Sequence, residues 1–156
     1  MRSLLCRIAA AIALVNGAAM IPAEAQEGTV PPAPNDLTAE IDPLDNPYHV
    51  DDGKVDRGTY NGYRRYHSSC HVCHGPDGLG SSFAPALVES LKSLDYVAFA
   101  EVVVNGRQAQ GATGNSVMPS FAFDPNVMEY MNDIYGYLKA RTDGALDRGR
   151  PQRLPK

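Results

Sequence analysis

The chain has 156 residues, a length that accommodates one domain with terminal extensions, and its 14 basic and 18 acidic residues give a net charge of −4. With 44% hydrophobic and 21% charged residues, the chain is neither intrinsically disordered nor a protein that binds nucleic acid through bulk positive charge. It has three cysteines, an odd number, which argues against a framework of disulfides.

Residues 1–25 have the pattern of a cleaved secretory signal. Two arginines precede an apolar run over 8–15, and an Ala-Glu-Ala sequence that a signal peptidase can read ends at Ala25. The apolar run is shorter than the ~18 residues of a membrane-spanning helix. Cleavage would leave Cys70 and Cys73 as the only thiols of an exported chain, so we expect a periplasmic location.

Charge is unevenly distributed along the rest of the chain. Residues 26–53 are rich in proline and carry seven acidic residues and no Lys or Arg, which predicts an extended arm or wrap without a core of its own. Residues 142–156 carry four basic and two acidic residues, which predicts a basic tail. The domain itself is expected over 54–141.

The domain has the periodicity of an all-α fold. Three helices are predicted, at about 56–67, 93–105 and 124–141. The second helix is expected to pack Val97, Phe99, Val102 and Val103 against the core. The Gly-rich run 75–80 is predicted to be a loop, as is 107–121, which shows no periodic apolar face. No run alternates well enough to be predicted as a strand.

The chemistry is concentrated in Cys70-His71-Val72-Cys73-His74, a C-x-x-C-H sequence that is typical of c-type haem attachment. Two thiols about one helical turn apart can each form a thioether with a vinyl group of one porphyrin, and His74 is then close enough to reach the iron. A thioredoxin-like redox pair would need a βαβ context, and a zinc knuckle would need a second pair of ligands. The motif therefore predicts one covalently attached haem c with His74 as an axial ligand.

The other axial position has several candidates. Met128 and Met131 fall on the apolar stripe of the last predicted helix, where we expect them to fill the core. Met118 lies in a loop and is followed by proline, so its thioether is free to serve as a soft iron ligand. The alternatives are an open site and the histidines His49, His67 and His71. His67 and His71 are too near the motif to reach the opposite haem face, and we expect both to be solvated.

In their order, these features resemble the class I monohaem cytochromes c over about 54–141. The resemblance implies an all-α fold of about three to five helices around one haem. It places Gly62 and Tyr66 on the first helix and Gly136 and Tyr137 on the last. Physically, the two glycines would let these helices cross closely, with the two tyrosines packed beside them.

The same resemblance assigns further site residues. Pro85 corresponds to the proline whose backbone carbonyl accepts the ring N–H of the axial histidine, here His74. Met118, with the proline that follows it, corresponds to the axial methionine motif. The expected haem-binding set is therefore Cys70, Cys73, His74, Pro85 and Met118, and the iron ligands are His74 and Met118.

A narrower resemblance extends to the terminal segments. The sequences at 46–48, 64–67 and 143–151 are similar to those of c-type cytochromes linked to methanol metabolism in methylotrophic bacteria. This implies an electron carrier, not an enzyme, that accepts electrons from a pyrroloquinoline-quinone (PQQ) methanol or alcohol dehydrogenase and passes them to a downstream cytochrome or oxidase.

Several alternatives stay open at this point. A five-coordinate haem that binds or senses a gas, and a haem peroxidase, both require an iron without a sixth protein ligand, and Met118 argues against them. The acidic arm and basic tail would steer a redox partner, or would only solubilise the protein or pair with each other.

Overall fold

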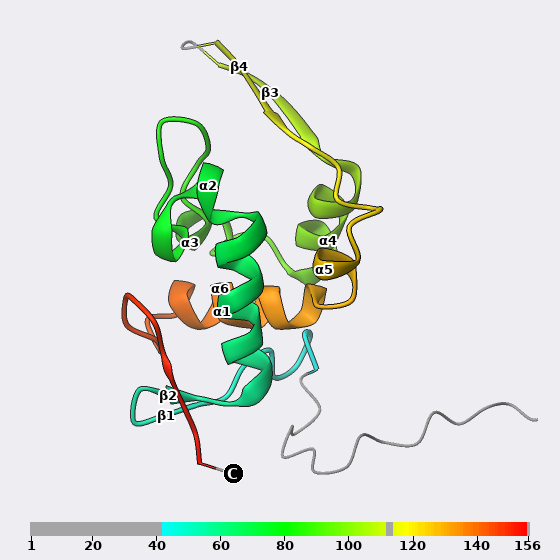
Figure 1. The fold of residues 1–156 in the computed structure, drawn as a ribbon. Coiled ribbons are helices and arrows are strands. Elements are labelled where there is room, and N and C mark those ends of the chain that lie inside the picture. The colour runs from blue at the N-terminus through cyan, green and yellow to red at the C-terminus, as the bar shows by residue number, and fades with distance from the viewer. Residues whose placement is uncertain (1–41, 112–113, 156) are drawn as a thin grey trace, which may run out of the picture. The chain divides into compact units, whose positions relative to one another are not determined.

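The computed structural model describes residues 42–111 and 114–155, so the predicted signal segment and most of the acidic arm lie outside the described residues. In the described ranges the helices are α1 (Arg57–Ser69), α2 (His71–His74), the 3-10 turn η1 (Pro76–Gly78), α3 (Leu87–Ser90), α4 (Tyr96–Asn105), α5 (Pro125–Met128) and α6 (Met131–Thr142). The strands are β1 (Val50–Asp51), β2 (Lys54–Val55), β3 (Arg107–Gly111), β4 (Gly114–Met118) and β5 (Gln152–Arg153). This mainly helical content confirms the predicted fold class (Figure 1). Within these ranges, no helix combines the length and the apolar character that crossing a bilayer requires.

Helix α1 begins where the sequence predicts it. Asp56 is the N-cap, and its carboxylate accepts hydrogen bonds from the backbone N–H of Gly58 at 2.8 Å and of Thr59 at 3.3 Å. The helix continues to Ser69, two residues beyond the predicted end. It carries the chain directly into the C-x-x-C-H motif.

Helices α1 and α6 cross at Gly62. A Cβ atom at this position would lie 1.8 Å from the backbone carbonyl oxygen of Asp133, so only glycine permits the crossing. Tyr66 and Tyr137 flank it with no exposed surface, and their ring centroids are 5.6 Å apart. The close crossing predicted at Gly62 is therefore confirmed.

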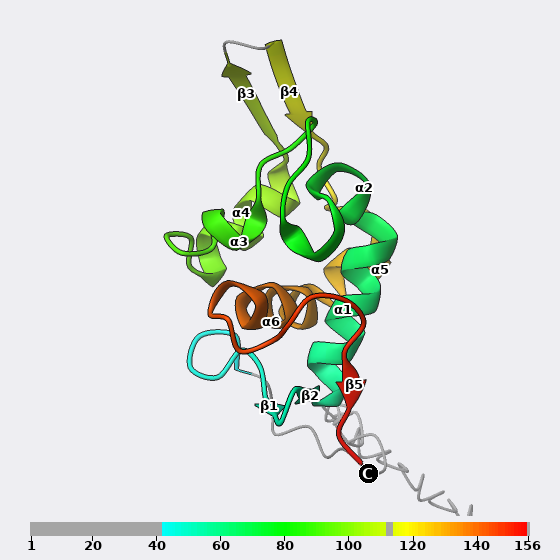
Figure 2. The ribbon, with the colours of Figure 1, turned by 90° about the vertical axis from the view of Figure 1, so that its left-hand side faces the viewer.

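The role predicted for Gly136 is wrong. A Cβ atom on Gly136 would lie 2.0 Å from the carbonyl oxygen of Pro47, which belongs to the segment that leads into β1. Gly136 therefore makes room for this segment to pass over α6, on a different face from α1 (Figure 2). At the crossing with α1 the glycine comes from α1, whereas at the Pro47 segment it comes from α6, and the sequence does not say which partner each glycine meets.

Helix α4 confirms the second predicted helix. The carboxylate of Asp95 caps it by accepting from the backbone N–H of Ala98 at 2.8 Å, and Gly106, with φ of +74°, ends it. Phe99 is buried, but Val97 is 55% exposed, so the core position predicted for Val97 is wrong. Residues two apart point to different sides of a helix, and only the side of Phe99 faces the core.

The segment 107–121, predicted as a loop, contains the β3–β4 hairpin (Figure 1). Its antiparallel ladder runs from the pair Arg107 and Met118 to the pair Gly111 and Gly114. The prediction failed because backbone hydrogen bonds between the two strands hold this ladder. Such pairing leaves no apolar period in strands of mostly polar and small residues.

The last predicted helix is two helices. Asp124 caps α5 through the backbone N–H of Asn126 at 2.9 Å, with proline at the first helical position as expected. The chain leaves helical geometry at Tyr130 (φ −119°, ψ 24°) before α6 begins. Met131 is buried, but Met128 is 36% exposed, and on α5 it is Val127, 1% exposed, that faces the core. The core position predicted for Met128 is therefore wrong.

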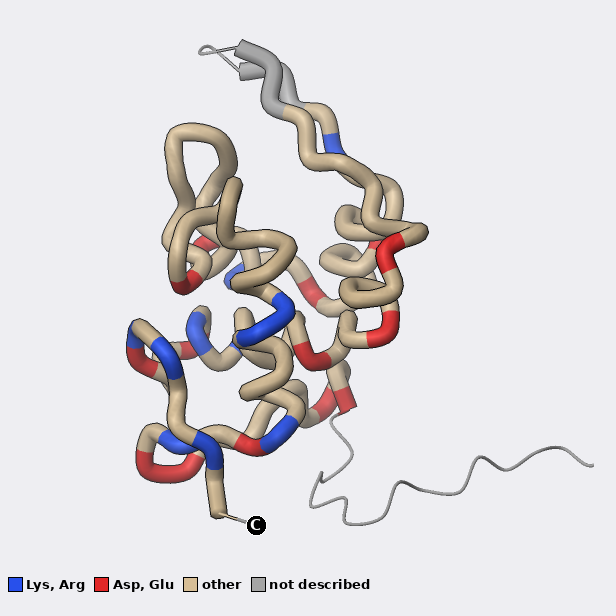
Figure 3. Tube along the Cα trace, viewed as in Figure 1, with Lys and Arg blue, Asp and Glu red and all other residues tan. Residues whose placement is uncertain are grey.

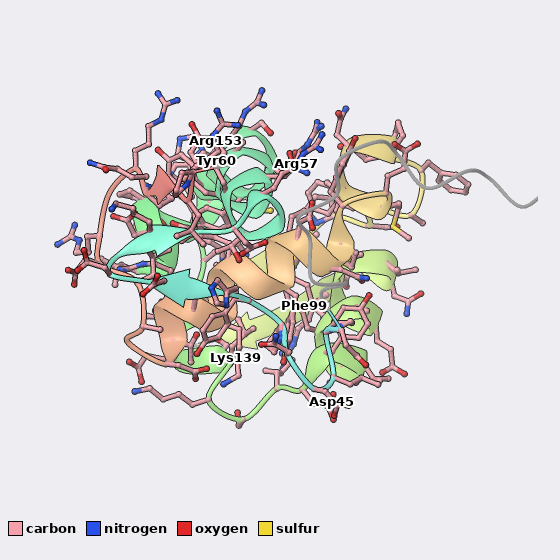
Figure 4. The ribbon with its side chains drawn as sticks, turned by 90° about the horizontal axis from the view of Figure 1, so that it is seen from below. Asp45, Arg57, Tyr60, Phe99, Lys139 and Arg153 are labelled. Carbon is pink, nitrogen blue, oxygen red and sulfur yellow. The ribbon has the colours of Figure 1, made fainter. Side chains whose placement is uncertain are left out.

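Parts of the acidic arm and of the basic tail meet in one small sheet. Strand β2 pairs with β1 in antiparallel fashion on one side and with β5 in parallel on the other. Arg153 of β5 lies over the ring of Tyr60 on α1, with Cζ 5.2 Å from the ring centroid (Figure 4). Tyr48 donates a hydrogen bond to Asp143 at 3.1 Å. The described parts of both extensions are thus bound to the domain and to each other.

Candidate functional site

The two motif cysteines lie one turn apart at the junction of α1 and α2. Cys70 sits between the helices, and its carbonyl oxygen accepts from the backbone N–H of Cys73 at 3.2 Å and of His74 at 3.0 Å. Cys70 is half-buried and Cys73 is exposed, and no disulfide joins them. The turn therefore presents two thiols at the spacing that two thioether bonds to one porphyrin require.

The imidazole of His74 is held in one orientation. The side chain is 7% exposed, and Nδ1 lies 2.9 Å from the carbonyl oxygen of Pro85. Because a carbonyl can only accept, Nδ1 carries the proton and Nε2 keeps its lone pair. The contact that the resemblance implied is thus present, and it prepares Nε2 to bind a metal.

Tyr66 fixes the loop that follows the motif, a role that sequence reasoning missed. Its hydroxyl donates to the carbonyl oxygen of Gly75 at 2.5 Å and accepts from the backbone N–H of Gly78 at 3.1 Å. Burial raises the pKa of Tyr66 well above its ordinary value of 10.0, so the hydroxyl stays protonated and can donate. The sequence indicated only an aromatic residue four positions before Cys70.

Asp77 was also missed. It is 5% exposed and has a φ of +59°, which is uncommon outside glycine. Its Oδ1 accepts from the backbone N–H of Gly149 at 3.0 Å and from the hydroxyl of Tyr137 at 3.4 Å, while Nε of Arg148 lies 3.6 Å from Oδ2. Asp77 therefore ties the C-terminal segment to the loop that follows His74. The available sequence signal was that Asp77 is the only charged residue between 66 and 88.

Met118 lies at the end of β4, half-buried against the hydrophobic core. The chain after Met118 is bound to the end of α4 by two hydrogen bonds. The backbone N–H of Phe121 donates to the carbonyl oxygen of Val103 at 3.0 Å. The hydroxyl of Ser120 donates to the carbonyl oxygen of Val104 at 2.5 Å. Figures 1 and 2 show the hairpin at the same end of the fold as α2, opposite the three-stranded sheet. The strand that ends at Met118 therefore lies at the same end of the fold as the helix that ends at His74.

The other three histidines occupy different environments. His49 is exposed and precedes β1, at the end of the fold away from α2. His71 is exposed, as predicted. His67 is half-buried: its Nδ1 lies 2.8 Å from the carbonyl oxygen of Tyr63, and its ring centroid lies 4.2 Å from that of Tyr63. The prediction that His67 is solvated is therefore wrong.

The donor set fits a c-type haem better than a thiolate centre. Burial raises the pKa of the Cys70 thiol to about 12, and the charges of Asp124 and Cys73 add to this shift. A neutral thiol is a poor thiolate ligand and a poor redox nucleophile, which argues against a thiolate metal centre or a redox pair at this turn. The oriented imidazole of His74, directly after the two cysteines, provides what a covalently held haem iron needs on one side.

Comparison with known proteins points to one family, although no protein-family model matches the chain. The chain is 50% identical over 102 residues to cytochrome c-553I of Paracoccus denitrificans, covering 65% of this chain and 45% of that protein. It is 42% identical over 96 residues to cytochrome c-555 of Methylococcus capsulatus, covering 61% of this chain and 72% of that protein. The chain therefore spans less than half the length of the first of these relatives.

A solved structure is similar to the chain in the same way as these two cytochromes. The crystal structure of the c-type cytochrome XoxG from Methylobacterium extorquens AM1 superposes with a TM-score of 0.64 at 52% sequence identity. The match covers 70% of this chain and 67% of that chain.

Proposed function

Because the chain belongs to the c-type cytochromes and carries one covalently bound haem c, we propose that it is a periplasmic one-electron carrier with His74 and Met118 as the axial ligands of the iron. The haem supplies a ferrous–ferric couple. The observation that carries the ligand proposal is the hydrogen bond between Nδ1 of His74 and the carbonyl oxygen of Pro85, which leaves Nε2 as the nitrogen available to the metal.

Each residue of the site has a defined task. Cys70 and Cys73 attach the haem, and Pro85 keeps the His74 ring in the tautomer and orientation that ligation needs. Tyr66 holds the two ends of the turn behind His74, since its hydroxyl bonds to both Gly75 and Gly78. A Met118 thioether on the iron favours the reduced state and raises the potential.

The surface around the attachment turn suits brief electron exchange. Residues 66–88 contain one charged side chain, Asp77, and it is buried. In Figure 3 the chain between η1 and α3 carries no Lys, Arg, Asp or Glu, whereas charged residues are frequent over α1 and the three-stranded sheet. Val72 is 72% exposed and Phe83 is 74% exposed in this part of the chain. We place the exchange surface here, beside the two cysteines.

The electron donor that we propose is a PQQ-dependent methanol or alcohol dehydrogenase, and the acceptor a downstream cytochrome or oxidase. The support is the similarity of 46–48, 64–67 and 143–151 to cytochromes linked to methanol metabolism. Two of these segments are bonded to each other, since Tyr48 donates to Asp143.

The test is anaerobic reduction of the purified holoprotein by such a dehydrogenase, followed at the haem absorption bands. We expect second-order reduction and a reduced spectrum that carbon monoxide does not alter. A haem that only a chemical reductant reduces would exclude this donor. A spectrum that carbon monoxide changes would instead favour the gas-binding alternative.

The same assay separates the two interpretations of the charged extensions. If the arm or the tail contacts the dehydrogenase, the second-order rate of haem reduction should fall as ionic strength rises from ~0.01 to ~0.15 M. The hydrogen bond from Tyr48 of the arm to Asp143 of the tail favours the other interpretation, pairing of arm and tail within the monomer, for which the rate should not depend on salt.

A further inference from the structure

Two histidines outside the proposed haem ligation lie side by side, one half-buried and the other exposed. His67 is in the last turn of α1, and His71 begins α2 four residues later, where the chain continues helically through Cys70. Their ring centroids are 5.5 Å apart, and the ring planes differ by 23°. A spacing of four residues brings side chains together on one face of a helix.

One ring of the pair is already held in the state that a metal ligand needs. Nδ1 of His67 lies 2.8 Å from the carbonyl oxygen of Tyr63, so Nδ1 carries the proton and Nε2 has the lone pair. The rings of Tyr63 and Tyr66 pack against the imidazole at centroid distances of 4.2 and 5.1 Å and limit its rotation. Histidines that bind metals almost always donate their other N–H in this way.

The separation of the rings also suits chelation. Two imidazoles that bind one tetrahedral ion at a metal–nitrogen distance of about 2.1 Å have ring centroids about 5.3 Å apart. The observed 5.5 Å is close to this value. The rings are stacked, with planes 23° apart, so binding requires the His71 ring to rotate, and its exposure leaves it free to do so.

We propose that His67 and His71 bind one divalent transition-metal ion, Zn²⁺ or Cu²⁺, at a surface site distinct from the haem iron. Imidazole nitrogen suits these ions, and Cu²⁺ binds more tightly than Zn²⁺ at a site of this type. Within the described part of the chain no third His, Cys, Asp or Glu joins the pair, so water completes the coordination. Because His71 lies between the two attachment cysteines, the ion adds positive charge beside the proposed exchange surface.

The test is calorimetric titration of Zn²⁺ into the tag-free holoprotein, in which both cysteines are thioethers and cannot act as thiolates. We expect one site and an unchanged haem spectrum. His71→Gln should lower the affinity at least tenfold, and because this side chain is exposed the variant should fold normally. His67→Gln should lower it to a similar extent.

The matched control is His49→Gln, which removes an exposed histidine at the other end of the fold and should leave the affinity unchanged. Full affinity in His71→Gln, equal loss in His49→Gln, or no binding at millimolar Zn²⁺ would each overturn the proposal. A change of the haem spectrum on addition of Zn²⁺ would also do so, because it would show that the ion acts at the iron site.

Discussion

The two sides of the proposed haem site are held in different ways. On the His74 side the imidazole, the loop behind it and the crossing of α1 with α6 are fixed by buried contacts at Pro85, Tyr66 and Gly62. On the Met118 side a two-stranded ladder and a few hydrogen bonds to the end of α4 hold the chain. The contacts on the His74 side stabilise the folded domain. The residues on the Met118 side mainly set the ligation of the proposed haem iron. Substitutions on the first should therefore unfold the protein, and those on the second should change the iron.

The largest effect is expected at the helix crossing. Gly62→Ala places a methyl group 1.8 Å from the Asp133 carbonyl oxygen, and backbone on both helices must move. We expect the free energy of unfolding to fall by at least about 4 kcal/mol, or the variant to fail to fold. Guanidinium unfolding of the holoprotein, followed by circular dichroism, measures it.

The control for this substitution is Gly53→Ala. Gly53 has a φ of +70° and nothing within 4 Å of an added Cβ, so only backbone strain of about 1–2 kcal/mol is expected. Equal losses in the two variants would show that the crossing is not tight.

A smaller effect separates the two methionines of the last helical region. Met131 is 6% exposed, and Met131→Ala should cost about 2–5 kcal/mol through the cavity that it leaves. Met128 is 36% exposed, and Met128→Ala should cost less than about 1 kcal/mol. Unfolding midpoints of the two variants measure the difference, and a cost at Met128 as large as that at Met131 would contradict the break between α5 and α6.

The smallest effect concerns pH. Burial raises the pKa of Asp133 above its ordinary value of 3.8, although the amide of Asn61 donates to its carboxylate at 2.6 Å and opposes the shift. The folded protein thus holds this proton more tightly than the unfolded chain. This favours the folded state at low pH and is lost as pH rises through the raised pKa.

Asp133→Asn removes this dependence and keeps an acceptor for Asn61. Relative to the wild type, the variant should therefore gain slightly in stability at neutral pH, and the gain should shrink toward pH ~4. Urea unfolding at both pH values tests this, and a gain that grows on acidification would reverse the assigned sign.

The parts of the fold that the sequence predicted are those with local signals. Asp56 and Asp95 cap α1 and α4 through backbone groups two or three residues away, and Gly106 ends α4 with its own backbone. Such contacts lie within one stretch of sequence. The C-x-x-C-H spacing is local in the same sense, so the motif predicted the placement of both thiols on one turn.

The parts that were missed depend on partners far along the chain. Asp77 meets Gly149, 72 residues away, and the sequence does not indicate which backbone group a loop carboxylate will find. In the same way, Gly136 needs the distant segment at Pro47 to reach it, and such contacts are products of the tertiary fold. The hairpin was missed for another reason: its strands are close in sequence, but they pair through backbone groups that leave no side-chain pattern.

The measurement that tests the account most directly is the sulfur-to-iron charge-transfer band of the ferric protein in Met118→Ala. We predict that the band disappears and the potential falls, while the unfolding free energy changes less than in Met131→Ala, which should keep the band. A band that survives in Met118→Ala would contradict the proposed ligation, and so would one that is lost in Met128→Ala instead.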